Sequence, residues 1–146
     1  MELSSNASIQ IQKPISEVFE AIVAPEKLNK YFISESNGRL ETGNDLMWKF
    51  PEFPDYYPIT EVNVVSNEFI SFVWDPETIV KINLESLNDG STLVKVYEGS
   101  KTYTKEHLNW LTQNSGGWAN FLACLKAYLE YGINLRKGAF DFMINN

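Results

Sequence analysis

The first third of the chain changes from the period of a strand to the period of a helix. Residues 9–12 alternate apolar and polar side chains, which predicts a short half-buried strand ending near Pro14. Residues 16–23 place apolar side chains on one helical face, and Ser16 is the expected N-cap. Pro25 should end this helix and begin a second one over residues 25–32. Both helices are too short to be stable in isolation, so they need a sheet to pack against.

The middle of the chain returns to period two in several short runs. Strands are predicted at residues 46–50, 59–65, 69–74, 79–87 and 92–98. Turn sequences at 66–67, 75–76 and 88–90 separate the later runs, and such short connections join antiparallel neighbours. The Pro- and Tyr-rich stretch 51–58 is predicted to be an irregular loop, serving as a lid or a subunit contact. These runs indicate an antiparallel meander.

The last third has a helical period. Apolar side chains over residues 118–133 fall within one broad stripe, which predicts a long amphipathic helix. Residues 106–113 are expected to form a leading turn or a separate short helix, because Gly116 and Gly117 follow them. The apolar segment 140–144 should either dock back on the sheet or exchange with a second subunit. This order of elements defines the α+β class in one domain over residues 1–146.

Composition narrows the classes of function. The chain has 146 residues, a net charge of −7 and 44% hydrophobic residues, which is typical of a folded acidic domain and argues against binding to nucleic acid. With one cysteine and one histidine, we expect neither a disulfide framework nor a metal site, and no cofactor is indicated. Residues 1–8 do not resemble a signal peptide, and no apolar run approaches the ~20 residues of a membrane span. A cytoplasmic location is the expectation.

Several motifs together resemble a known superfamily. The motifs are I-Q-K-P-I-S-E-V-F-E-A-I at residues 11–22, P-E-K-L-N-K-Y-F at 25–32, F-V-W at 72–74 and the helix that opens with Gly117 and Trp118. Their order is similar to the START-like (SRPBCC) superfamily, and specifically to the subgroup named after the activator of Hsp90 ATPase. The resemblance covers residue 8 to about residue 132. It implies a helix-grip fold, in which a curved antiparallel sheet of six or seven strands wraps around a long C-terminal helix and often encloses an apolar cavity.

Alternation along the strands and the helix defines a candidate inward face. The resemblance to the START-like superfamily implies that this face lines a cavity, although the same side chains could simply fill a core. In residues 59–65 the inward face stays open, because either Thr60, Val62 and Val64 or Ile59, Glu61 and Asn63 could point inward. The predicted lining comprises Trp48, Phe50, Tyr57, Glu61, Phe72, Trp74, Ile82, Val94, Val96, Glu98, Trp118, Phe121, Leu122 and Leu125.

Catalytic signatures are missing from the sequence. Glu61 and Glu98 lie in predicted strands and could face the interior, where burial would raise the pKa of a carboxyl group. His107 fits an exposed position, and Cys124 fits a small buried hydrophobic side chain. Nucleophile elbows, phosphate-binding loops and dinucleotide fingerprints do not occur in the sequence. We therefore assign no catalytic residue.

The sequence favours a non-enzymatic domain that binds a small, largely apolar ligand between the sheet and the C-terminal helix. A first alternative, implied by the resemblance, is a protein that contacts a chaperone of the Hsp90 type. A second is an enzyme of the cyclase or dehydratase type that uses an interior carboxylate. The oligomeric state is expected to be monomer or homodimer.

Overall fold

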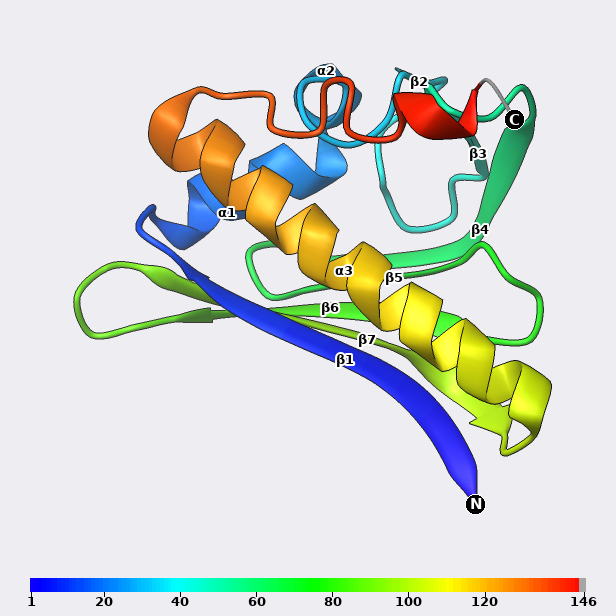
Figure 1. Cartoon of the computed structure of the whole chain (residues 1–146). Coiled ribbons are helices and arrows are strands. Elements are labelled where there is room, and N and C mark those ends of the chain that lie inside the picture. The colour runs from blue at the N-terminus through cyan, green and yellow to red at the C-terminus, as the bar shows by residue number, and fades with distance from the viewer. Residues whose placement is uncertain (145–146) are drawn as a thin grey trace.

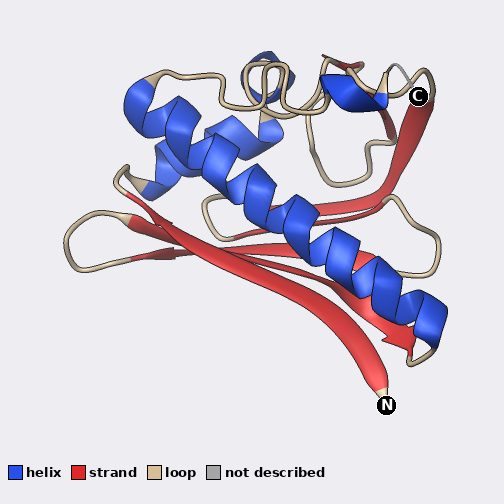
Figure 2. Cartoon of the chain, viewed as in Figure 1, coloured by secondary structure: helices blue, strands red, loops and turns tan. Residues whose placement is uncertain are grey.

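The computed structural model describes residues 1–144 as a curved antiparallel sheet crossed on one face by a long helix (Figures 1 and 2). The sheet has seven strands in the order β1-β7-β6-β5-β4-β3-β2. This arrangement confirms the predicted helix-grip architecture. The strands are β1 (Glu2–Ile11), β2 (Glu35–Ser36), β3 (Leu46–Lys49), β4 (Tyr56–Val65), β5 (Phe69–Val73), β6 (Ile79–Ser86) and β7 (Thr92–Thr102). The helices are α1 (Ile15–Val23), α2 (Pro25–Leu28), α3 (Lys105–Tyr131) and the short 3-10 helix η1 (Asp141–Met143).

The N-terminal elements differ from their predicted bounds. β1 begins at Glu2 rather than at residue 9, because Leu3 and Ser5 are buried and the strand pairs with β7 along its whole length. α1 has Pro14 as its N-cap, so Ser16 lies inside the first turn and does not cap the helix. α2 ends at Leu28, and residues 29–32 are turns. The proposed irregular loop 51–58 is shorter, since β4 already begins at Tyr56.

The helix α3 is one continuous element over Lys105–Tyr131, and no separate short helix precedes it. Its N-cap is Thr104, whose side chain accepts a hydrogen bond from the backbone N–H of His107. Gly116 and Gly117 are exposed and leave the helix unbroken, because packing against β1 outweighs their low helix propensity. The helix ends at Gly132, which adopts a left-handed conformation with φ of 65°.

A bulge in β4 answers the question of which side chains of residues 59–65 face inward. The pairing register with β5 shifts between Thr60 and Asn63, and Glu61 has a positive φ of 52°. The extra residue lets Ile59 and Val62 both point into the core. Glu61 is exposed as a result, so the expectation that it faces the interior is wrong.

The space between the sheet and the middle of α3 is filled by side chains. A void of only about 10 Å³ lies there, against Trp48, Phe72 and Phe121. Trp48 Nε1 faces no hydrogen-bond partner, the one such buried side-chain atom within residues 1–144. Eight predicted lining residues are buried in this core: Trp48, Phe72, Ile82, Val94, Val96, Phe121, Leu122 and Leu125.

Across the described residues, no helix combines the length and the apolar character that crossing a membrane requires.

Candidate ligand-binding site

A cavity of about 440 Å³ lies beside the N-terminal half of α3. Its wall is built from α3, the loop between β3 and β4, the end of β5 and the chain after α3. This volume falls in the range of sites for small organic molecules. Four predicted residues line it, namely Phe50, Tyr57, Trp74 and Trp118. The other lining residues are Phe32, Glu52, Phe53, Trp110, Gln113, Asn114, Gly117, Asn120, Arg136 and Phe140.

Two stacked indoles form part of this wall. The rings of Trp74 and Trp118 are 5.2 Å apart between centroids, with an interplanar angle of 29°. Phe50 packs against Trp74 at 6.4 Å and edge-on against Tyr57 at 6.0 Å. Aromatic pairs at such spacings are attractive beyond the area that they bury. The cavity therefore presents a preformed aromatic surface.

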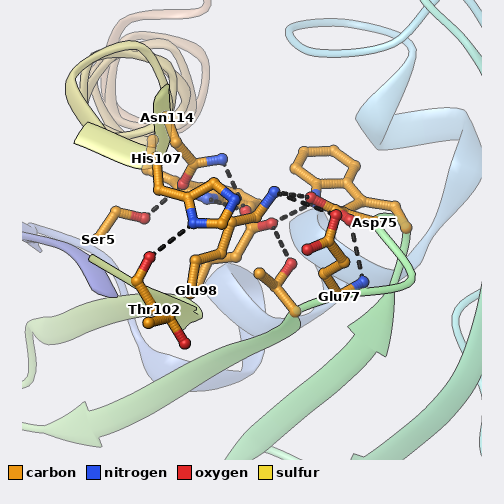
Figure 3. A network of polar contacts seen from close by, with 11 residues as sticks. Ser5, Asp75, Glu77, Glu98, Thr102, His107 and Asn114 are labelled. Atoms are coloured by element: carbon orange, nitrogen blue, oxygen red, sulfur yellow. Dashed lines mark hydrogen bonds and ion pairs between the residues drawn. The ribbon is translucent and has the colours of Figure 1, made fainter. Parts of the chain in front are cut away.

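Both indoles are held by the buried carboxylate of Glu98, which is only 1% exposed on β7 (Figure 3). Trp74 Nε1 donates to Glu98 Oε2 at 3.0 Å, and Trp118 Nε1 donates to Glu98 Oε1 at 2.9 Å. Thr78 Oγ1 and Asn114 Nδ2 donate to the same two oxygens at 2.7 and 2.9 Å. Four donors thus compensate the desolvation of the carboxylate.

A second group of polar side chains, which includes Asp75 and Glu77, lies next to this network (Figure 3). Lys101 Nζ is 2.9 Å from Asp75 Oδ2 and 4.9 Å from the ring centroid of Trp110. Burial would raise the pKa of Asp75, but the backbone N–H of Glu77 and the Lys101 ammonium outweigh it and lower the pKa below 3.8. These contacts fasten the turn between β5 and β6 to β7 and α3.

The single histidine, His107, lies near this polar network but outside the cavity wall. His107 Nδ1 lies 2.6 Å from the carbonyl oxygen of Thr102, at the junction of β7 and α3. The residue is half-buried and does not line the cavity. Cys124 is fully buried in α3, as expected, and burial raises the pKa of its thiol.

Among residues 1–144, the only charged pair that lines the cavity joins Glu52 and Arg136, 84 residues apart in sequence. Arg136 Nη1 donates to Glu52 Oε1 at 3.0 Å, and Nη2 donates to Oε2 at 2.6 Å. The side chain of Arg136 is 11% exposed and that of Glu52 is 6% exposed. The guanidinium carbon also lies 5.3 Å from the ring centroid of Phe50 and 5.9 Å from that of Phe32. Because the pair is internally neutral, the cavity carries no net charge from its lining.

The sequence analysis missed the part of the wall that comes from distant segments. Phe140 had a signal, because segment 140–144 is apolar and one predicted alternative had it dock back. Phe140 lines the cavity, whereas Phe142 and Ile144 are exposed. Nothing in the sequence indicated that Glu52 and Arg136 pair, since a salt bridge between residues 84 positions apart leaves no local sequence pattern.

The predicted carboxylates do not form a recognisable acid–base site. Glu61 is exposed, and Glu98 lies behind the indoles with both oxygens engaged as acceptors. Within the described residues, no group of three or more His, Cys, Asp or Glu side chains could hold a metal ion.

Fold and cavity together define a protein of the helix-grip class. The model of the family described as "Activator of Hsp90 ATPase homolog 1-like protein" matches residues 12–130, most of the chain. The chain belongs to this family, which the sequence motifs had indicated. Comparison with curated proteins finds no match.

Solved structures show the same fold. Protein SSP2350 from Staphylococcus saprophyticus is 30% identical with a TM-score of 0.81, over 92% of this chain and 96% of that one. The Aha1 dimer from Colwellia psychrerythraea is 20% identical with a TM-score of 0.75, over 89% and 98%. DynU16, described as a protein in the dynemicin biosynthetic locus, is 23% identical with a TM-score of 0.78, over 90% of this chain and 48% of that one. The dimer is a property that this description gives to the Aha1 protein from Colwellia psychrerythraea.

Proposed function

We propose that this protein binds a small, largely apolar ligand without transforming it, in the cavity between the N-terminal half of α3 and the loop between β3 and β4. The observation that carries the proposal is the aromatic surface of Trp74 and Trp118, which is already stacked and is held by the buried Glu98. A preformed site spares the ligand the cost of ordering these side chains.

The cavity walls also suit such a ligand. Of the fourteen described residues that line it, eight are aromatic, and the two charged ones neutralise each other. Burying an apolar molecule there removes apolar surface from water, whereas a charged molecule would lose its hydration without a free counter-charge. The amides of Gln113 and Asn120 lie on the same wall and can orient one polar group of the ligand.

Two adjacent glycines of α3 allow a direct test by blocking the cavity. Gly117 lines it and Gly116 does not, and an added Cβ at either position meets no atom within 4 Å. Leucine has a higher helix propensity than glycine, so neither variant should unfold the helix. We expect Gly117→Leu to weaken binding of the neutral fluorescent probe N-phenyl-1-naphthylamine at least about tenfold, which is 1.4 kcal/mol. Titration of probe fluorescence measures this affinity.

Gly116→Leu is the matched control and should bind the probe like the unmodified protein. Thermal unfolding of both variants would verify that the fold is retained. Equal probe affinity in the two leucine variants would show that the probe does not use this cavity, and would refute the proposal.

A further inference from the structure

The chain after α3, residues 133–144, folds back beside the cavity as a segment with its own internal hydrogen bonds. We call residues 133–144 the C-terminal segment. From residue 134 onward its backbone hydrogen bonds within the described chain stay inside it, as from Ala139 N–H to Arg136 at 2.9 Å and from Met143 N–H to Phe140 at 3.0 Å. Apart from the bond from Ile133 N–H to the carbonyl oxygen of Ala127 at the end of α3, backbone pairing therefore does not attach the segment to the sheet or to α3.

The C-terminal segment also buries few apolar side chains against the rest of the domain. Exposed apolar side chains include Ile133 at 53%, Leu135 at 52% and Ile144 at 55%. A segment with few buried apolar contacts is among the first parts of a fold to open.

One side chain carries most of the attachment. Arg136 makes both hydrogen bonds to Glu52 and lies over the rings of Phe32 and Phe50, all of which belong to the body of the domain. Phe140 of the same segment also lines the cavity. A bidentate pair of this kind is strong and specific in geometry.

Two glycines flank this anchor. Gly132 and Gly138 have φ values of 65° and 74°, a left-handed backbone conformation that residues other than glycine rarely adopt. An added Cβ at Gly132 would meet open space, so the glycine is required by backbone conformation and not by packing. Gly132 is therefore the point at which the chain can turn between α3 and the segment.

The anchor also separates two cavities. A second cavity of about 720 Å³ shares Phe32, Glu52, Arg136 and Phe140 with the first one. Its other walls include polar side chains such as Asn29, in contrast to the aromatic first cavity. Separation of Arg136 from Glu52 would join the two spaces.

We propose that the C-terminal segment is a cover, hinged at Gly132 and latched by Arg136 and Glu52, and that its opening admits ligand to the aromatic cavity. The inference rests on the proposed function for its ligand, but the latch is a property of the protein without ligand. Opening and ligand entry can therefore be measured separately.

The first test replaces the latch carboxylate by its neutral isostere. Glu52→Gln turns an amide donor toward the guanidinium and loses the ion pair. We expect hydrogen–deuterium exchange of the C-terminal segment to become at least about tenfold faster, since charged hydrogen bonds are among the stronger ones. Stopped-flow mixing should show faster association of N-phenyl-1-naphthylamine by a similar factor.

The matched control is Glu20→Gln, which breaks another bidentate pair with arginine, Arg39, away from the cavity. It should leave both rates unchanged. The double variant Glu52→Arg with Arg136→Glu restores an opposite-charge pair and should slow exchange again relative to Glu52→Gln.

The outcomes distinguish the two proposals. If Glu52→Gln exchanges and binds the probe at the rates of the unmodified protein, the latch is refuted while the ligand site stands. If exchange accelerates but neither Glu52→Gln nor the unmodified protein binds the probe, the proposed function fails, and the segment is a latched element without that role.

Discussion

Glu98 shows how one buried residue sets the geometry of the candidate site. Its carboxylate is one of few buried polar groups and accepts hydrogen bonds from the connection between β5 and β6 and from α3. Trp74 and Trp118 are oriented by these bonds as well as by their mutual stacking. The residue therefore acts as a positioning group for the aromatic wall.

Glu98→Gln tests this role at nearly constant volume. The amide NH₂ would face donors that now point at a carboxylate oxygen, leaving at least one buried donor unpaired. We expect the free energy of unfolding to fall by about 3 kcal/mol, measured by urea denaturation.

The control is Glu85→Gln on β6, where the side chain is exposed, and it should change stability by less than about 0.5 kcal/mol. If the Glu98 variant is as stable as this control, the four hydrogen bonds do not organise the site.

Among the elements, β4 is the one whose irregularity decides what faces the cavity side of the sheet. The bulge at Glu61 places Ile59 and Val62 together in the core and turns the carboxylate to solvent. Its cost is a non-glycine residue held at a φ of 52°. Left-handed conformations of this kind cost about 1–2 kcal/mol for residues with a Cβ.

Glu61→Gly should therefore stabilise the protein by about 0.5–1 kcal/mol in urea unfolding, after the extra entropy of glycine in the unfolded chain is subtracted. Glu61→Ala keeps the Cβ and removes the same exposed carboxylate, so it should bring no gain. Equal effects of the two substitutions would contradict backbone strain as the cause.

Sequence patterns predicted the elements well where burial repeats regularly. The strands β5 and β6 and the end of α3 lie within one or two residues of their predicted bounds, since their apolar side chains keep period two or 3.6. β1 was predicted too short, because its buried position Ser5 is polar and bonds Asn114 of α3. The bulge was missed because two opposite parities each fitted part of residues 59–65.

The candidate site was only partly predictable for a related reason. Alternation identifies an inward face, but it cannot tell which inward side chains fill the core and which border a space. Phe50 and Trp74 border the cavity. Phe72 lies on β5, only two residues before Trp74, and is buried in the core. That distinction depends on where α3 and the C-terminal segment cross the sheet, which is a property of the tertiary fold.

At the scale of the whole molecule, ion pairs connect parts of the chain that no strand pairing joins. Arg39, in the chain before β3, forms a bidentate pair with Glu20 of α1, with a distance of 2.9 Å from Nη2 to Oε2. The hydrogen bond from the guanidinium is the main cause that holds the pKa of Glu20 below 4.5, although burial opposes it. The side chains are 36% and 39% exposed, so solvent screening reduces what the pair contributes.

The sign of the pH dependence follows from that lowered pKa. Because the folded state holds Glu20 deprotonated more strongly than the unfolded state, the contribution is present above pH 4.5 and is lost as the pH falls through the folded pKa. Glu20→Gln should cost about 0.5 kcal/mol near neutral pH, and this cost should shrink at an acidic pH below 4.5. Urea unfolding of both proteins at the two pH values measures it, and a cost that does not shrink in acid would rule out the ion pair as its source.

Because Trp74 and Trp118 both donate to the carboxylate of Glu98, their intrinsic fluorescence should report on ligand binding. A guest lying on one indole would disturb the electronic surroundings of the other through the common acceptor and the stacked rings. Occupancy could then be followed through native tryptophan emission, so candidate molecules from a natural extract could be screened with no dye and no engineered label.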